Sequence, residues 1–173
     1  TIGFGLLYGM GPYKLSQRLG VTYEKAVEYM ELFFKAYPGA HGWITQVHED
    51  CLETGVVWTI LNRPRRLNEI FSDESWVRAR AKRQSVNSII QGSAADVVLS
   101  AMLKVDMDEV LATLACILLL QVHDELVFEV PEDCVDEALP RVKTLMEYSR
   151  EADDLEVDLT VSAHIGDNWK DAK

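Results

Sequence analysis

The residues best suited to chemistry lie in a short polar segment that follows an apolar run. Residues 114–122 form an apolar run of strand length, and His123, Asp124 and Glu125 come directly after it. A carboxylate at the tip of a tight hairpin has a rigid base and an open approach, which suits an oxygen ligand for Mg²⁺. Asp124 and Glu125 are adjacent, so only one of them is expected to face a given metal ion. The plain alternative is a polar turn without function.

Two other groups of side chains recur every four residues. Phe4 and Tyr8 would share one face of a helix, where core packing is the ordinary alternative to a binding role. Arg83, Asn87 and Gln91 have the same spacing and are compatible with one helical face. The spacing alone assigns no function to either group.

The charge of the chain is unevenly distributed. Its formal net charge is −11, but residues 63–83 hold seven basic and three acidic residues, a local net of +4. Arg63, Arg65 and Arg66 lie at the start of this basic island. A basic island in an acidic body can be an electrostatic footprint for phosphate. A solvated helix face with scattered arginines is the alternative.

Length and composition indicate one packed globular domain. The chain has 173 residues, of which 48% are hydrophobic and 26% are charged, as in ordinary globular proteins. The longest apolar run is too short to span a bilayer, and residues 1–10 lack the basic start of a secretory signal, so no membrane partner is expected. Three widely spaced cysteines without a CxxC pair argue against a disulfide framework or a structural zinc site.

The first two thirds of the chain is predicted to be mainly helical, because apolar residues recur there at helical spacing. Helices are expected over residues 22–37, 41–53, 74–90 and 94–111. Thr22 is expected to cap the first of these, and residues 91–93 are expected to break or kink the long helical stretch at Gly92. A short hairpin is expected over residues 56–70.

The remainder is predicted to contain an antiparallel sheet. Residues 114–122 and 126–130 have the pattern of two strands joined by a tight polar turn. Residues 132–148 have amphipathic helical spacing that Pro140 must kink or divide. Residues 156–163 alternate acidic and apolar side chains, as an exposed strand would. The fold class is therefore α+β, with most helices N-terminal and a small antiparallel sheet C-terminal.

Four blocks of the chain resemble family A (DNA polymerase I-like) DNA polymerases, in family order. Residues 121–127, Gln-Val-His-Asp-Glu-Leu-Val, resemble motif C, the palm hairpin that bears a catalytic aspartate. Residues 4–11 resemble the second half of motif B, the fingers helix that closes over the incoming nucleotide. Residues 83–96 resemble the intervening helices near template and primer, and residues 166–169 match the usual C-terminal ending. The resemblance implies part of a polymerase domain, with fingers over about residues 1–70 and palm over about residues 71–173.

The resemblance also implies an activity, which is template-directed transfer of nucleotides from dNTPs to a primer 3′ end. Asp124 would be a ligand of the two Mg²⁺ ions that clamp the attacking and leaving oxygens. Glu125 would support it, and His123 would approach the primer terminus. Phe4 and Tyr8 would line the nucleotide pocket, with Phe4 implying discrimination against dideoxynucleotides and Tyr8 stacking near the template base.

Several polar side chains are implied to contact DNA. They are Arg63, Arg65, Arg66, Arg83, Asn87, Gln91 and Gln121. Arg83, Asn87 and Gln91 would face the minor groove, where all base pairs present hydrogen-bond acceptors at similar positions. Side-chain donors aimed at these acceptors can test the shape of a base pair without selecting its sequence. The arginines of residues 63–66 resemble a basic hairpin near the duplex backbone, which implies phosphate contacts. A solvated turn is the alternative for this hairpin.

The chain also departs from the family pattern. Gly3 stands where many members have Asn, and residues 62–64 interrupt what is commonly a run of Gly and Arg. The Arg and Lys that begin motif B and grip the triphosphate, and motif A with the other metal-binding aspartate, do not occur in these residues. The chain, which begins with Thr1, is therefore expected to be a C-terminal fragment that is inactive alone and needs the N-terminal polymerase portion in cis or in trans.

Three hypotheses follow for function. The first is a segment of a DNA-directed DNA polymerase, with primer–template DNA, dNTPs and the N-terminal polymerase portion as partners. The second is a catalytically incomplete module that binds primer–template DNA. The third is an acidic α+β protein without a nucleic-acid role, which would fail to bind primer–template at any salt concentration. The expected location is the cytoplasm of a bacterial or phage-infected cell, with an organelle as the alternative.

Overall fold

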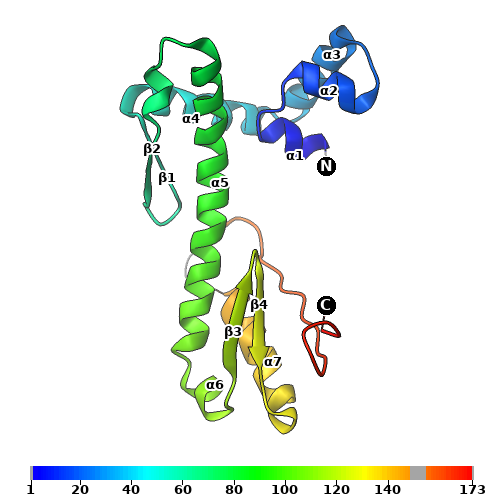
Figure 1. Ribbon diagram of the computed structural model, residues 1–173, viewed down its shortest axis with the longest axis vertical. Helices are drawn as coiled ribbons and strands as arrows, with labels where there is room; N and C mark the ends of the chain where they lie inside the picture. Colours follow the sequence, from blue (N-terminus) through cyan, green and yellow to red (C-terminus); the bar gives the residue numbers. More distant parts are fainter. Residues whose placement is uncertain (1, 149–154, 173) are drawn as a thin grey trace. The chain divides into compact units, whose positions relative to one another are not determined.

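Helices make up most of the structure, and two short antiparallel hairpins accompany them (Figure 1). The computed structural model describes residues 2–148 and 155–172. The chain divides into two compact units, residues 1–92 and residues 93–173, and each unit holds a two-stranded sheet. This mixture of helices and antiparallel strands confirms the predicted α+β class.

The first unit is mainly helical, with a small hairpin. Its elements are α1 (Ile2–Leu7), α2 (Pro12–Leu19), α3 (Tyr23–Ala36), α4 (Pro38–Thr54), β1 (Val56–Trp58), β2 (Pro64–Arg66), the 3-10 helix η1 (Asn68–Phe71) and α5 (Ser75–Asp106) as far as Gly92. The predicted cap is confirmed, since the Thr22 hydroxyl accepts a hydrogen bond from the Lys25 backbone N–H at 3.3 Å. Helix α4 begins earlier than predicted because Pro38 suits a first helical turn. Gly55 ends it with a φ of 68°, a conformation that favours glycine.

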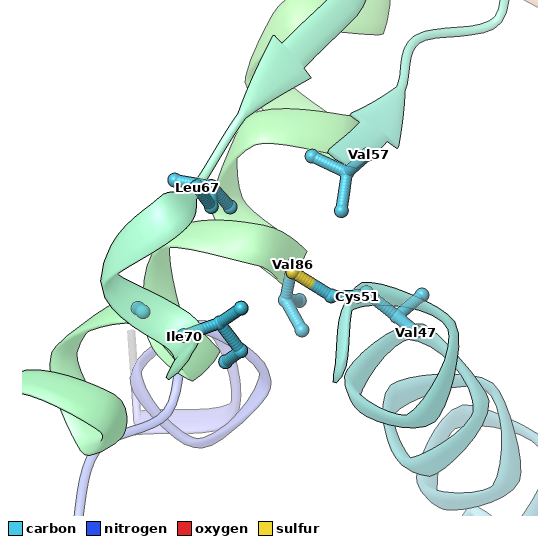
Figure 2. Close-up of a cluster of buried hydrophobic side chains, with 7 residues drawn as sticks. Val47, Cys51, Val57, Leu67, Ile70 and Val86 are labelled. Carbon is cyan, nitrogen blue, oxygen red and sulfur yellow. The ribbon is translucent and has the colours of Figure 1, made fainter. Parts of the chain in front are cut away.

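A buried cluster packs α4 and the β1–β2 hairpin against α5 (Figure 2). Its members are Val47, Cys51, Val57, Leu67, Ile70, Ala81 and Val86. Burial of a valine, leucine or isoleucine side chain stabilises a fold by about 1.5–3 kcal/mol relative to leaving it exposed. A separate cluster joins α1, α2 and α3 through Leu6, Leu15 and Ala26. These two clusters position the N-terminal helices and the hairpin of the first unit.

The predicted break at residues 91–93 is wrong, because α5 continues through them as one helix. Gly92 allows the β1–β2 loop to lie close to the helix, and it does not form a turn. A Cβ at Gly92 would lie 2.5 Å from the Thr59 Cγ2 methyl, and the Arg63 guanidinium donates to the Gly92 carbonyl at 3.1 Å. The helix therefore carries a glycine where the β1–β2 loop comes closest to it.

The second unit combines a hairpin with short helices. Besides the last turns of α5 its elements are α6 (Glu109–Thr113), β3 (Ile117–Val122), β4 (Glu125–Glu129), the 3-10 helix η2 (Glu132–Cys134) and α7 (Val135–Glu147). The predicted hairpin is confirmed, since β3 and β4 pair antiparallel with Val122 opposite Glu125. The buried core of the unit consists of Val105, Leu111, Ala138 and Val142.

Two helix predictions in this part of the chain are corrected. The helix expected to reach residue 111 ends at Asp106, and the separate helix α6 begins at Glu109 with Asp108 as its N-cap. Pro140 lies inside α7 without dividing it. A proline at this position removes the hydrogen bond to the carbonyl of Asp136, in the first turn of the helix, and leaves the later turns able to form.

The strand predicted over residues 156–163 is wrong, because the described residues 155–172 contain no strand. The backbone N–H of Val161 bonds instead to the Glu147 side chain, with a distance of 2.8 Å to Oε1. Alternating acidic and apolar residues suit an extended chain, but a strand also requires a neighbouring strand with free backbone groups. The sequence pattern cannot supply that neighbour.

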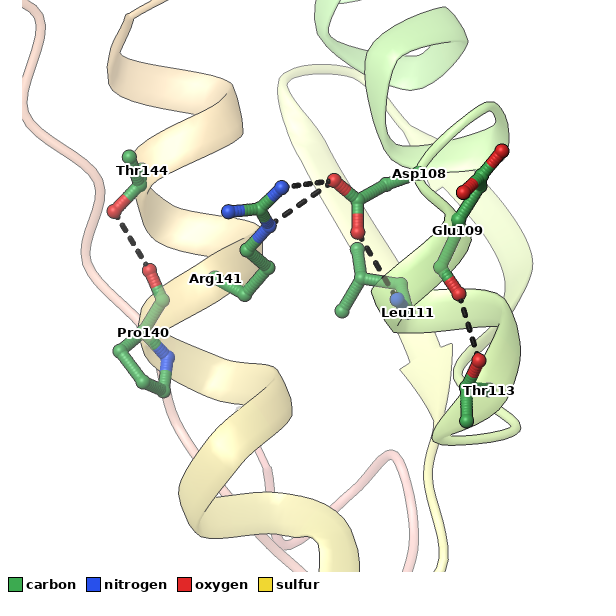
Figure 3. Close-up of polar contacts among 7 residues, drawn as sticks. All are labelled: Asp108, Glu109, Leu111, Thr113, Pro140, Arg141 and Thr144. Atoms are coloured by element: carbon green, nitrogen blue, oxygen red, sulfur yellow. Dashed lines mark hydrogen bonds and ion pairs between the residues drawn. The ribbon is translucent and has the colours of Figure 1, made fainter.

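Asp108 joins α6 to α7 with both oxygens of its carboxylate (Figure 3). Its Oδ1 accepts a hydrogen bond from the Leu111 backbone N–H at 3.0 Å, which caps α6. Its Oδ2 accepts from Nε and Nη2 of Arg141 on α7, at 3.0 and 2.6 Å. The Asp108 side chain is only 7% exposed. The Arg141 hydrogen bonds, followed by the Leu111 N–H, lower the pKa of this carboxyl.

Helix α5 is also long and apolar enough to cross a bilayer when judged by length and composition alone. The core helix of a soluble protein can meet the same criterion of length and composition. In this structure only 22% of the apolar window of α5 is buried. Arg78, Arg80 and Arg83 lie in the first half of the helix, and Ala81 and Val86 belong to a packed cluster. One helix that meets the criterion is weak evidence for a membrane span.

The contact at Gly92 can be tested with a compensating pair of substitutions. Gly92→Ala should lower the free energy of unfolding by about 1–3 kcal/mol, because the new methyl overlaps the stiff Thr59 side chain. This loss should occur even though alanine raises helix propensity. Thr59→Ser removes the obstructing methyl and keeps the hydroxyl that accepts from the Arg63 N–H at 3.1 Å, so the double variant should recover most of the stability in urea unfolding. A single Gly92→Ala variant more stable than the parent would contradict this account.

The two functions of Asp108 can be separated by substitution. Asp108→Ala should lower the free energy of unfolding by about 1–2 kcal/mol, because α6 loses its cap. Asp108→Asn retains a capping oxygen and loses the charge, so it should be less destabilising than alanine. Unfolding in urea at neutral pH measures both. Equal losses for the two variants would show that the ion pair dominates and that the cap contributes little.

Candidate active site

The predicted metal-binding segment is a two-residue turn between β3 and β4. Val122 and Glu125 are the last paired residues, so His123 and Asp124 form the turn. His123 has a φ of 58°, in the left-handed region that the first position of such a hairpin turn needs. The Gln121 side-chain amide donates to the His123 carbonyl at 2.6 Å. The turn is therefore braced from within the hairpin.

The side chains of this turn are open to solvent. His123, Asp124 and Glu125 are all exposed. Mg²⁺ takes oxygen ligands, commonly one or two protein carboxylates together with phosphate oxygens and water. The described residues contain no group of three or more His, Cys, Asp or Glu that could hold a metal ion. The hairpin carboxylates have the oxygen chemistry that Mg²⁺ takes, and alone they are too few to enclose a metal ion.

The predicted nucleotide-contacting aromatics lie at the start of the first unit. Phe4 is on α1 and is 67% exposed, so it is not a core residue. Tyr8 follows α1 and is half-buried, and its backbone N–H donates to the Phe4 carbonyl at 2.9 Å. The helical repeat therefore extends from Phe4 to Tyr8, as their spacing predicted.

Tyr8 and Arg83 line one pocket of about 290 Å³ in the first unit. A Cβ on Gly9, which has a φ of 81°, would lie 2.6 Å from the Arg83 Cγ. The turn after Tyr8 therefore passes directly over the aliphatic part of Arg83. The structure thus brings together a predicted nucleotide contact and a predicted DNA contact that are 75 residues apart in the sequence.

Arg83, Asn87 and Gln91 follow one another on successive turns of α5. Arg83 and Gln91 are exposed, and Asn87 is half-buried. The Asn87 Oδ1 is buried and has no hydrogen-bond partner among the described residues. A buried acceptor without a partner costs about 1–3 kcal/mol, so a donor supplied by a ligand would be favourable there.

The three arginines of the β1–β2 hairpin have different surroundings. Arg63, in the loop, bonds to the Gly92 carbonyl of α5. Arg65 and Arg66 are on β2 and are exposed, and neither has an ion pair or hydrogen bond from its side chain in the described part of the chain. Arg63 therefore positions the hairpin, whereas the guanidinium groups of Arg65 and Arg66 point into solvent.

The C-terminal block forms a compact turn. A Cβ at Gly166 would lie 2.6 Å from the Ala172 backbone nitrogen, so the chain returns on itself there. The Asn168 Oδ1 accepts from the backbone N–H groups of Lys170 and Asp171 at 3.1 and 3.3 Å. This turn has no room for a side chain at Gly166, and the Asn168 side chain stabilises it by accepting two backbone hydrogen bonds.

The model of DNA polymerase family A matches residues 1–171 of the chain. The chain belongs to DNA polymerase family A. It is 41% identical over 173 residues to "DNA polymerase I, thermostable" of Thermus filiformis and 37% identical to DNA polymerase I of Geobacillus stearothermophilus. These matches cover 100% of this chain and 20% and 19% of the two relatives. The chain thus spans about a fifth of the length of these family A polymerases.

A solved family member has a closely similar fold. The structure described as "POL domain of Pol1 from M. smegmatis complex with DNA primer-template and dNTP" superposes with a TM-score of 0.91 at 38% sequence identity. The match covers 99% of this chain and 30% of that one. The resemblance stated from the four sequence blocks is therefore confirmed, and so is the fold of a partial family A polymerase domain. The roles of individual residues stay predictions.

His48 belongs to the Tyr8–Arg83 pocket although the sequence motifs do not include it. It lies on α4, with its Nε2 3.1 Å from the Lys82 carbonyl oxygen. Burial, together with the Lys82 charge, lowers the pKa of His48. His41, Thr45 and His48 recur at helical spacing and all line this pocket, a polar row on α4 that could have identified the residue from the sequence.

His48 should make stability depend on pH in the mildly acidic range. Its folded-state pKa is below the ordinary value of 6.5, so as pH falls below about 6.5 the unfolded chain takes up the proton first and folding stability is lost. His48→Gln should reduce that loss between pH 7.5 and pH 5.5, measured by urea unfolding at both values. His164→Gln, at an exposed histidine, is the matched control. An unchanged pH dependence in His48→Gln would contradict the prediction.

Proposed function

We propose that this chain takes part in template-directed DNA synthesis, as a segment of a larger family A DNA polymerase that transfers nucleotides from dNTPs to a primer 3′ end. The observation that carries the proposal is an exposed aspartate, Asp124, on a braced two-residue turn of a chain that belongs to this family over nearly its whole length. The similar M. smegmatis domain was solved with primer–template and dNTP, which supports the same partners here.

Within this proposal the hairpin carboxylates hold metal. Asp124 would bind the Mg²⁺ ions with Glu125 in support, and bound Mg²⁺ would stabilise the negative charge that develops during phosphoryl transfer. His123, in the same turn, would approach the primer end. The Gln121 amide holds the His123 carbonyl, and in this way it orients the turn that carries all three side chains. Its own DNA contact is part of the same proposal.

The first unit would bind the other partners. The exposed ring of Phe4 would contact the sugar of the incoming nucleotide, and Tyr8 would stack near the template base. Arg83, Asn87 and Gln91 would contact the minor groove, where the unpartnered Asn87 Oδ1 would gain a donor. The cations of the β1–β2 hairpin would contact the phosphates of the duplex.

The fingers would comprise about residues 1–70 and the palm about residues 71–173. The protein would act in the cytoplasm of a bacterial or phage-infected cell, with an organelle as the alternative. The 173-residue polypeptide by itself would not extend a primer. One hairpin offers two adjacent carboxylates, and the described residues add no group of three or more potential ligands. Two metal ions need carboxylates from a second segment, which would be the N-terminal polymerase portion.

The proposal is tested by primer extension with Mg²⁺ and dNTPs. In the polymerase that contains this segment, Asp124→Ala should lower the incorporation rate by on the order of 100-fold or more, because a charged metal ligand is lost. Glu129→Ala, at an exposed carboxylate at the other end of β4, is the matched control and should extend normally. A normal rate for Asp124→Ala would refute the role of this residue.

The incomplete-site proposal has its own test. The isolated 173-residue polypeptide should show no metal-dependent extension, and mixing with the N-terminal portion should restore it. Extension by the isolated polypeptide that Asp124→Ala abolishes would show that one hairpin is enough. Binding of primer–template without extension, even after the N-terminal portion is supplied, would favour the catalytically incomplete DNA-binding module.

A further inference from the structure

The β1–β2 hairpin presents an exposed tryptophan. In the antiparallel register Trp58 lies opposite Pro64, and Val56 lies opposite Arg66. Residues opposite each other, and residues two apart on one strand, share a face of a hairpin. Trp58, Pro64 and Arg66 therefore lie on the same face, with Arg66 diagonal to the indole. The Trp58 side chain is 52% exposed, which leaves much of its ring free for contact.

The charged residues of the hairpin segment are all basic. Residues 56–67 contain three arginines and no acidic residue, in a chain whose net charge is −11. Arg65 and Arg66 have no carboxylate partner among the described residues. Charge complementarity therefore favours a negatively charged partner at this hairpin over a basic or an apolar one.

The hairpin is also held rigidly. The Thr59 backbone N–H donates to the Arg63 carbonyl at 3.1 Å, the Asn62 N–H donates to the Thr59 carbonyl at 2.9 Å, and the Arg63 N–H donates to the Thr59 hydroxyl at 3.1 Å. Asn62 takes the left-handed conformation with a φ of 56°. Arg63 also bonds to the Gly92 carbonyl. A loop with these restraints loses little conformational freedom when a ligand binds.

We propose that this hairpin is a binding platform for single-stranded DNA, on which Trp58 stacks against an unpaired base while Arg66 contacts a neighbouring phosphate. An unpaired base exposes its aromatic face, whereas a base inside a duplex is covered on both sides by its neighbours. Stacking tolerates every base, as a template-reading protein requires. The proposal goes beyond the duplex phosphate contacts assigned above to the arginines, and it rests on the proposed function only in taking DNA as the partner.

Fluorescence anisotropy with the full chain tests the platform. The probes are a fluorescein-labelled sixteen-nucleotide oligo-dT, which has no paired structure, and a labelled blunt duplex of the same length. Trp58→Ala should weaken oligo-dT binding by about tenfold, as expected for the loss of one aromatic stack, and should change duplex binding much less. Trp58→Phe keeps an aromatic ring and should retain most of the affinity. Arg66→Ala should weaken binding and reduce the salt dependence by about one phosphate contact.

A second exposed tryptophan provides the matched control. Trp76 is 65% exposed and lies at the start of α5, where its indole N–H bonds to Glu74. Trp76→Ala should leave oligo-dT affinity unchanged, and circular dichroism melting shows whether each variant is folded. Unchanged oligo-dT binding by folded Trp58→Ala would overturn the platform. An equal loss for oligo-dT and duplex would also overturn it, because the contact would then be to backbone common to both.

Different measurements test the Trp58 platform and the catalytic role of Asp124, so either can fail alone. Primer extension that is insensitive to Asp124→Ala would refute the catalytic role and would leave the oligo-dT comparison intact. Loss of oligo-dT binding in Trp58→Ala together with normal sensitivity to Asp124→Ala would support both. Normal extension chemistry with unchanged oligo-dT binding in Trp58→Ala would refute the platform alone.

Discussion

The close approach of the β1–β2 loop to α5 at Gly92 fixes where the hairpin lies along that helix. With no Cβ at this point the Thr59 methyl can lie against the helix backbone, and the Arg63 guanidinium reaches the Gly92 carbonyl. The hairpin is then held on α5 at its loop as well as through the buried Val57. The exposed Trp58 face and the solvent-directed Arg65 and Arg66 take their orientation from these two attachments.

In the second unit a single carboxylate links two helices. One nearly buried carboxylate, on Asp108, caps α6 and also binds Arg141 of α7. Desolvation of a charge is costly unless it is fully hydrogen-bonded, and here each oxygen has donors. The core of Leu111, Ala138 and Val142 packs beside this link. The β3–β4 hairpin, whose tip carries Asp124, is attached to that core through Phe128.

The candidate site could be predicted from the sequence wherever its geometry is local. The turn at His123 and Asp124 needs only two strands of alternating pattern and two residues between them, so its position was evident from residues 114–130. The i, i+4 relation of Phe4 and Tyr8, and that of Arg83, Asn87 and Gln91, are properties of one helix. The link between Tyr8 and Arg83 in one pocket, and the presence of His48 beside them, depend on how separate helices pack and could not be derived this way.

The sequence by itself determined the family, the α+β class and the hairpin that carries Asp124, because short motifs and short-range periodicity depend on neighbours in the chain. It misjudged Gly92, which the pattern marked as a helix break, and residues 156–163, which the pattern marked as a strand. In both cases tertiary structure decided the outcome. A glycine remains helical when another segment occupies the space its side chain would take, and an alternating segment becomes a strand only when another strand offers its free backbone groups.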